Sequence, residues 1–204
     1  MIEVMKKIIE NVLTALYQPF GFSVVMTILV MFFYMFVKEH GIKVVVQRWV
    51  NEFKTSGRFR RIFLLVFYIA MILFRTLLNR DMWRNPISNV IGVWGLYNEN
   101  GELTTETIEN LVLFIPFTVL LLWSFREKII SQSVKLFVTL WKSIEIVFLF
   151  SLTIEFLQLF LHLGTFQLSD LFYNTLGGLI GGLIYWCGYK VTHRNKKEQK
   201  DNIS

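Results

Sequence analysis

The chain has few of the residues on which catalytic and metal-binding sites usually depend. Its 204 residues include one cysteine, three histidines and three prolines. A single cysteine, Cys187, excludes an internal disulfide framework and a metal site built from several cysteines. The three histidines form no cluster in the sequence, and no Ser-His-Asp pattern is present. We therefore predict that the protein uses no metal and no cofactor, and we assign no catalytic residue.

Charged residues are also scarce, at 18% of the chain, whereas 54% of the residues are hydrophobic and 16% are aromatic. Ordinary soluble domains contain about 45 to 50% apolar residues. A chain of this composition has too few polar side chains to cover its surface in water. A lipid bilayer would solvate the surplus, because a helix of roughly 20 mostly apolar residues crosses about 30 Å of hydrocarbon.

Hydrophobic runs of suitable length recur along the sequence. Their lengths suit tilted membrane helices, which tolerate some mismatch with the bilayer thickness. We predict an all-α integral membrane protein with about five transmembrane helices and amphipathic interfacial helices. The predicted spans are residues 20–37, 62–78, 110–125, 138–161 and 170–189.

The distribution of Lys and Arg predicts the orientation of these spans. The segments between the first two spans, between the third and fourth, and after the fifth hold most of the 21 basic residues. Loops rich in Lys and Arg stay in the cytoplasm, so we place the N terminus outside and the C terminus inside. The formal net charge of +6 is explained by attraction to anionic lipid on the cytoplasmic side. We predict no binding to nucleic acid.

Two shorter segments have the pattern of helices that lie along the membrane surface. In residues 42–54 apolar side chains recur at helical spacing opposite polar ones, as expected for an amphipathic helix on the cytoplasmic leaflet. Its predicted lipid contacts are Lys43, Arg48, Trp49 and Lys54. Residues 2–16 repeat the pattern more weakly, and Pro19 marks the break before the first span.

Several polar side chains fall inside the predicted spans, where an ionisable group costs roughly 2.5 to 3.5 kcal/mol and needs a partner, water or a function. Under the predicted topology they lie at a similar depth, toward the outer ends of their helices. We therefore predict a shared polar pocket open to the external face, in which Arg75 neutralises Glu155 or Asp170. The candidate ligand-binding residues are Arg75, Asn110, Glu155, Gln158, Asp170 and Asn174.

Simpler structural roles remain open for some of these residues. Asp170 could cap the last helix, and Asn174 and Gln158 could serve only as hydrogen-bonding groups between helices. Glu155 has no such simple explanation, because it lies about two turns inside a span. Small residues at four-residue spacing predict close helix packing. In the last span these are Gly177, Gly178, Gly181 and Gly182.

Two motifs stand out in the last two predicted spans. One is Glu-x-x-Gln, from Glu155 to Gln158, and the other is Asp-x-x-x-Asn-x-x-Gly-Gly-x-x-Gly, which begins at Asp170. Residues 110–117 add an Asn-x-x-x-Phe-x-Pro pattern, and residues 84–87 add a loop with asparagine and proline. Together these motifs resemble the signature of the VanZ-like membrane proteins over residues 62–190.

On this resemblance the chain divides into three parts. Residues 1–61 form an N-terminal extension, residues 62–190 a VanZ-like core of four transmembrane helices, and residues 191–204 a basic cytoplasmic tail. The family usually shows an arginine between its last two helices, whereas residues 164–167 of this chain contain none.

The resemblance implies a multi-pass protein of the bacterial cytoplasmic membrane that is connected with resistance to teicoplanin-type glycopeptide antibiotics. We expect the polar pocket to bind a lipid headgroup, a lipid-linked cell-wall precursor or a lipoglycopeptide without catalysis. Two alternatives remain. One is an enzyme or proton-coupled carrier that uses Glu155 as acid or base. The other is a scaffold that recruits partners through Lys43, Arg48 and Lys54.

Overall fold

The computed structural model of the chain describes residues 2–38, 41–78, 82, 85–97, 100–130 and 134–201, with the backbone alone at 37–38 and 194–201. These residues fold mainly into helices. In chain order they are α1 (Ile2–Tyr17), α2 (Phe20–Lys38), α3 (Ile42–Thr55), α4 (Gly57–Leu73), the π-helix η1 (Phe74–Leu78), α5 (Glu106–Ile129), α6 (Leu136–Leu161) and α7 (Leu168–Asp201). Within the described residues, the only strand-like pairings are isolated bridges of Met82 with Leu163 and of Tyr97 with Leu103.

The prediction of an all-α membrane protein is confirmed. Four helical segments of the described chain are long and apolar enough to cross a membrane, namely Ile2–Phe36, Gly57–Leu78, Glu106–Ile129 and Leu136–Leu161. The first joins α1 and α2 across the turn at Gln18 and Pro19. The helix α7 is not among the four, because Asp170, Asn174 and several glycines lower its mean hydropathy.

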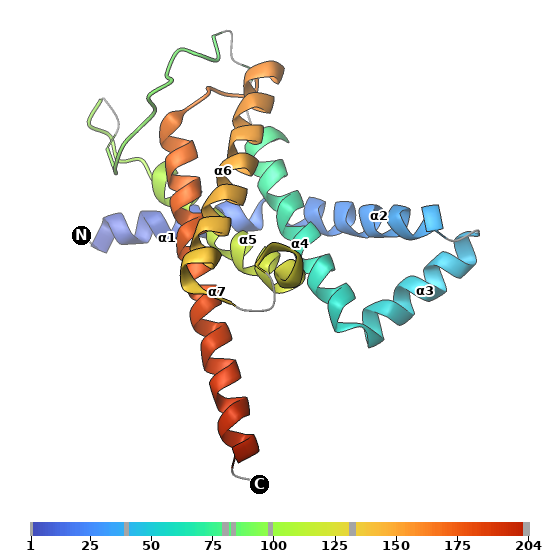
Figure 1. Cartoon of the computed structure of the whole chain (residues 1–204). Helices are drawn as coiled ribbons and strands as arrows, with labels where there is room; N and C mark the ends of the chain where they lie inside the picture. The colour runs from blue at the N-terminus through green and yellow to red at the C-terminus, as the bar shows by residue number, and fades with distance from the viewer. Residues whose placement is uncertain are drawn as a thin grey trace.

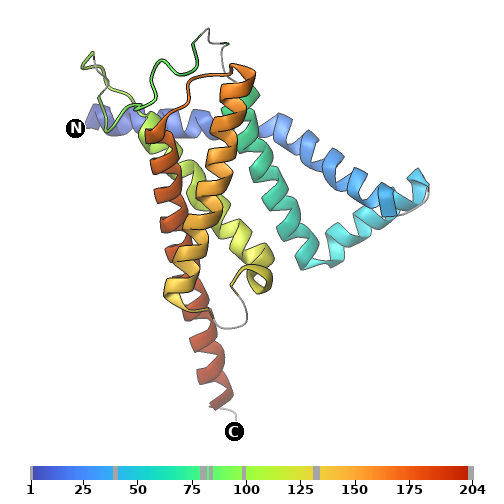
Figure 2. The same cartoon turned by 45° about the horizontal axis from the view of Figure 1, so that its top comes forward.

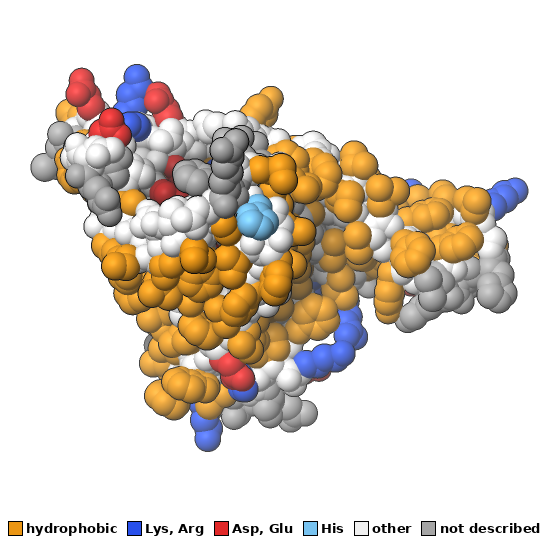
Figure 3. All heavy atoms as spheres, turned by 90° about the horizontal axis from the view of Figure 1, so that it is seen from above, with side chains coloured by type: hydrophobic (Ala, Val, Ile, Leu, Met, Phe, Trp, Pro, Cys, Tyr) orange, Lys and Arg blue, Asp and Glu red, His pale blue; other side chains and the backbone are white. Residues whose placement is uncertain are grey.

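The surface of the helices suits lipid rather than water. Figure 3 shows hydrophobic side chains over a broad band of the visible face, with Lys, Arg, Asp and Glu gathered toward its edges. Phe33, Phe137 and Phe160 are each more than two-thirds exposed. Soluble monomers rarely expose contiguous apolar surface on this scale, so a bilayer provides the environment that these side chains need.

Chain direction alternates between the two ends of the bundle. The helices α4 and α6 run from one end to the other, and α5 and α7 run back (Figure 2). We call the end where α5 and α7 begin the polar end, because Glu155 and Asp170 lie there. The opposite end, which holds Arg61 and Arg126, is the basic end. Which end faces the cell exterior stays a prediction from the distribution of Lys and Arg.

The N-terminal helices contact the bundle. The helix α1 lies across the polar end (Figure 2), where Asn11 Nδ2 donates to Thr105 Oγ1 at 2.7 Å and Lys7 Nζ donates to the Leu103 carbonyl at 3.2 Å. The helix α2 then diverges from the bundle, and α3 returns to the start of α4, so the three helices form a triangle (Figures 1 and 2). Among the described residues, α1 therefore packs on α5, and α2 and α3 pack on α4.

An aromatic cluster holds α3 against α4. Trp49 stacks on Phe53 with ring centroids 5.3 Å apart and meets Phe63 edge-on at 6.1 Å. The indole of Trp49, a predicted lipid contact, is half-buried and packs among rings from both helices. Lys43, Arg48 and Lys54 are exposed, and their role as lipid contacts stays a prediction.

Glycines bring α7 into close contact with two helices. A Cβ added at Gly181 would lie 2.6 Å from the Ile115 carbonyl oxygen in α5, and one at Gly178 would lie 2.6 Å from Val147 Cγ2 in α6. Gly177 faces α5 and Gly182 faces α6 in the same way. Each partner helix therefore meets one pair of the four glycines for which we predicted close packing.

Candidate functional site

The packing register between α6 and α7 brings the predicted polar residues face to face. Because the two helices are antiparallel, four residues forward on α7 match four residues back on α6. The contacts that define this register are Gly182 with Ser143, Gly178 with Val147, and Asn174 with Ser151. The next step toward the polar end places Asp170 at the level of Glu155.

Glu155 and Asp170 are both deeply buried at this level. Glu155 is 2% exposed and Asp170 is 6% exposed. Glu155 Oε2 accepts a hydrogen bond from the backbone amide of Gln167 at 3.0 Å. Asp170 lies in the first turn of α7, where the positive end of the helix dipole favours a carboxylate. The start of α7 therefore provides polar backbone for both acids.

Asn174 and Ser151 tie α7 to α6 one turn deeper. Asn174 Nδ2 donates to Ser151 Oγ at 2.8 Å, and both side chains are buried. Ser151 precedes Glu155 by four residues on α6, so the two lie on the same face of that helix. Asn174 and Glu155 therefore lie on facing helix surfaces and not on opposite sides of the bundle.

Gln158 links α6 to the π-helix. Its Nε2 donates to the Thr76 carbonyl in η1 at 2.7 Å. The last carbonyls of a helix lack partners within that helix, and Gln158 supplies one. π-Helical turns are rare and are often found at functional sites. Gln158 thus connects the η1 turn to the face of α6 that carries Glu155.

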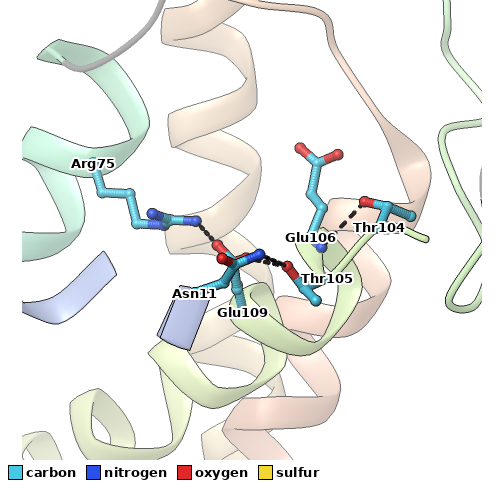
Figure 4. Close-up of polar contacts among 6 residues, drawn as sticks. All are labelled: Asn11, Arg75, Thr104, Thr105, Glu106 and Glu109. Atoms are coloured by element: carbon cyan, nitrogen blue, oxygen red, sulfur yellow. Dashed lines mark hydrogen bonds and ion pairs between the residues drawn. The ribbon is translucent and has the colours of Figure 1, made fainter. Parts of the chain in front are cut away.

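Arg75 has a different partner from the one that we predicted. Its Nη2 forms an ion pair with Glu109 Oε2 near the start of α5 (Figure 4). The prediction that Arg75 neutralises Glu155 or Asp170 is therefore wrong. The physical reason is that Glu109 lies at the same end of the bundle on a helix packed against α4. Glu109 lies just outside the predicted third span, which begins at Asn110, so hydropathy did not mark it as a partner for Arg75.

The ion pair is part of a network that includes the N-terminal helix. Glu109 Oε1 accepts from Thr105 Oγ1 at 2.5 Å, and Thr105 Oγ1 accepts from Asn11 Nδ2 at 2.7 Å (Figure 4). The side chains of Arg75 and Glu109 are 23% and 10% exposed. This network joins η1, α5 and α1 at the polar end.

Three amide groups at the polar end have unused hydrogen-bonding capacity. Asn110 Nδ2, Gln158 Oε1 and Asn174 Oδ1 are buried and have no hydrogen-bond partner among the described residues. They come from α5, α6 and α7, and each residue is more than nine-tenths buried. Buried polar atoms are nearly always paired, and an unpaired one costs about 1–3 kcal/mol. One amide nitrogen and two amide oxygens at the polar end are therefore left without a partner in the described part of the chain.

The segment that precedes α5 folds back over the connection between α6 and α7. The amides of Phe166, Leu168 and Ser169 donate to the carbonyls of Pro86, Val90 and Ile91 at 2.9, 2.8 and 3.3 Å respectively. Gly92 adopts a φ of +74°, which glycine tolerates, and it approaches Ser169 and Gln167 so closely that a Cβ there would overlap both side chains. Residues 85–97 thus cover the polar end beside Glu155.

Several polar contacts of this site were not predicted from the sequence. Ser151 could have been found, because it lies four residues before Glu155 on one face of α6. No periodic signal marks Gln167, which lies in a connection, or Glu109, which precedes the predicted span. Arg84, which belongs to the predicted loop motif, lies outside the described residues.

The chemistry of the polar end is that of hydrogen bonding and negative charge. Its buried groups are carboxylates, amides and hydroxyls from four helices. In the described part of the chain, no group of three or more His, Cys, Asp and Glu residues could hold a metal ion. Such a set of donors and acceptors suits recognition of a polar head, such as a sugar, a peptide or a hydrated headgroup.

Comparison with known proteins agrees with these motifs. A model of the VanZ/LLP1 family matches residues 22–189, a region that includes most of α2 and all of α3. Protein VanZ of Enterococcus faecium is 28% identical over 118 residues, which cover 54% of this chain and 66% of that protein. The chain thus matches just under two-thirds of the length of this relative, and no solved structure matches it. Because the family match spans most of its length, the chain belongs to the VanZ/LLP1 family.

Proposed function

We propose that this protein contributes to resistance against teicoplanin-type glycopeptides without catalysing a reaction, by binding the polar head of an amphiphilic cell-envelope molecule at its polar end. The class of ligand includes a lipid headgroup, a lipid-linked cell-wall precursor and the lipoglycopeptide itself. In each of the three, a hydrogen-bonding head is attached to a hydrocarbon chain. The polar end would face the cell exterior, as the distribution of Lys and Arg predicts.

The observation that supports this proposal is that three buried amide atoms have no hydrogen-bond partner among the described residues. A ligand that bonded to Asn110 Nδ2, Gln158 Oε1 and Asn174 Oδ1 would relieve up to about 1–3 kcal/mol of unfavourable burial for each atom. Neutral amides suit sugar hydroxyls and peptide groups, which also present both donors and acceptors. Binding and not bond cleavage is therefore the activity that these groups support best.

Apolar side chains at the same end offer a surface for an acyl chain. Phe160 and Leu161 end α6, and Leu168 and Phe172 begin α7. All four are exposed. A polar head held between the helices would leave its chain along these side chains, in contact with lipid. This arrangement favours an amphiphile over a small soluble ligand.

Two matched substitutions on α6 test the proposal. Glu155→Gln keeps the shape of a buried side chain at the polar end and removes its charge. Glu145→Gln makes the same chemical change ten residues away, where Glu145 is half exposed and pairs with Lys142 at 2.7 Å. Both variants and Asn174→Ala would be produced in a susceptible bacterial host at equal abundance in the membrane. The measurement is the minimal inhibitory concentration of teicoplanin.

We expect Glu155→Gln and Asn174→Ala to lose most of the resistance that the wild-type protein confers, and Glu145→Gln to retain it. Full resistance of both polar-end variants at normal abundance would contradict the proposed site. A pH-dependent flux in proteoliposomes that disappeared in Glu155→Gln would instead favour the carrier.

A further inference from the structure

A second candidate site lies at the basic end, far along the bundle from the polar residues. A cavity of about 800 Å³ opens there between the start of α4, the end of α5 and the middle of α7. Arg58 and Arg61 line it from α4, and Arg126 and Lys128 line it from α5. Tyr185, Tyr189 and His193 line it from α7. The proposed resistance function uses none of these residues.

The charge of this cavity is strongly unbalanced. Four of its lining side chains are Arg or Lys, and the carboxylate that lines it belongs to Glu127. Glu127 pairs with Arg126 at 3.2 Å, but the side chain of Glu127 is 78% exposed. Exposed ion pairs of this kind contribute little stability. The cavity therefore presents an excess of positive charge to any ligand.

Arg61 is held at the cavity by its contacts with Trp123. Its guanidinium carbon lies 5.6 Å from the ring centroid of Trp123, and its Nη1 donates to the Trp123 carbonyl at 3.4 Å. Arg61 Nε and the nearby Ser124 Oγ are buried and have no hydrogen-bond partner among the described residues. Arg61 therefore keeps one buried donor without a partner in the described chain, which is uncommon in folded proteins.

A break in α5 turns the next cation toward α7. Phe125 leaves helical geometry, with φ −127° and ψ 23°. Arg126, the next residue, lies with its guanidinium carbon 5.3 Å from the ring centroid of Tyr189. The Tyr189 ring stacks on His193 at 3.7 Å between centroids. The kink therefore gathers Arg126 and two aromatic rings of α7 around the space beside Arg61.

We propose that this cavity binds the phosphate of an anionic phospholipid headgroup. Arginine is well suited to phosphate, because its planar donors can bond two phosphate oxygens at once. Tyr and Trp favour the boundary between the bilayer and water, and Trp123, Tyr185 and Tyr189 lie around the cavity. Exposed Leu183 and Ile184 continue along α7, where an acyl chain would lie. These apolar neighbours favour a lipid over free phosphate.

Native mass spectrometry of the purified full-length protein in detergent tests this site. Three probes would be titrated separately: a short-chain phosphatidylglycerol, a phosphatidylcholine of the same chain length, and inorganic phosphate. The first two distinguish an anionic from a zwitterionic headgroup. The third distinguishes a lipid from a soluble phosphate. Wild-type protein is expected to bind phosphatidylglycerol at least about tenfold more tightly than either of the others. Both lipids carry a phosphate, but the basic side chains repel the choline cation of phosphatidylcholine, and inorganic phosphate lacks an acyl chain that could pack along α7.

Variants locate the binding. Arg126→Gln and Arg61→Gln are each expected to weaken binding of phosphatidylglycerol about tenfold. Arg60→Gln is the matched control, because Arg60 is exposed on α4 and donates to the Phe53 and Lys54 carbonyls outside the cavity. If Arg61→Gln fails to fold, Arg126→Gln decides the question alone, since it lies beyond the kink near the end of α5.

Three results would overturn the proposal. One is equal affinity for phosphatidylglycerol and phosphatidylcholine. Another is binding of inorganic phosphate as tight as that of phosphatidylglycerol, which would exclude a lipid as the specific ligand. The last is an Arg126→Gln variant that binds phosphatidylglycerol as tightly as Arg60→Gln does.

Discussion

The contact between α7 and α5 allows a sharp prediction about stability. A Cβ added at Gly181 would lie 2.6 Å from the Ile115 carbonyl oxygen and 2.8 Å from Thr118 Cβ, whereas ordinary contacts begin at 3.4 Å. Neither neighbour can move away by changing a rotamer, because one is backbone and the other is a Cβ. Gly181→Ala therefore requires the two helices to separate by roughly 0.8 Å, and overpacking of this kind costs about 1–3 kcal/mol.

A second glycine on the same helix isolates the effect of packing. A Cβ added at Gly188 meets no atom within 4 Å. Alanine is a better helix former than glycine by about 1 kcal/mol. Gly188→Ala is therefore expected to leave the free energy of unfolding unchanged or to raise it by up to about 1 kcal/mol, because only the helix propensity of the residue changes. Gly181→Ala has the same gain in propensity but must also separate the helices.

Reversible unfolding in mixed detergent micelles, followed by circular dichroism, measures both variants. Gly181→Ala should have a free energy of unfolding lower than that of Gly188→Ala by about 1–3 kcal/mol. Equal stabilities would show that α5 and α7 are not in close contact at this glycine. The register that places Gly177 against Leu111 and Gly181 against Ile115 would then be wrong as well.

Two further predictions concern the polar end. Glu109→Gln should lower the free energy of unfolding by about 1.5–3 kcal/mol, because Arg75 loses its charged partner. The double variant with Arg75→Gln should recover part of this loss, and strictly additive losses of stability in the two single variants would contradict the ion pair. Gly92→Ala should make residues 85–97 more sensitive to limited proteolysis, because its Cβ would overlap Ser169. Gly95→Ala is the control, since Gly95 also has positive φ but meets no atom within 4 Å; equal sensitivity of the two variants would contradict the contact.

The positions of the membrane helices could be predicted because they depend on local composition. The predicted spans at 20–37 and 138–161 match α2 (Phe20–Lys38) and α6 (Leu136–Leu161) closely. Hydropathy cannot reveal a helix that continues beyond an apolar run. The helices α5 and α7 therefore extend further than predicted, and they end at Ile129 and Asp201 respectively. The π-helix was also missed, since its wider turn depends on packing and not on composition.

The sequence predicted which residues lie at the candidate site better than it predicted which of them contact one another. Periodicity places Glu155 and Gln158 on the same side of one helix, and the structure keeps both buried at the polar end. Partner choice depends on tertiary geometry, which is why Arg75 meets Glu109 and not one of the deeper carboxylates. For the same reason, no pattern in the sequence could show that the amide of Gln167 binds Glu155.

A high-resolution electron-microscopy map of the protein in bacterial-lipid nanodiscs, with teicoplanin added, would show whether an amphiphile binds at the polar end. We expect density for a non-protein molecule within hydrogen-bonding distance of Gln158 Oε1 and Asn174 Oδ1. A map that shows both oxygens bonded to other protein groups, or to ordered water alone, would contradict this expectation.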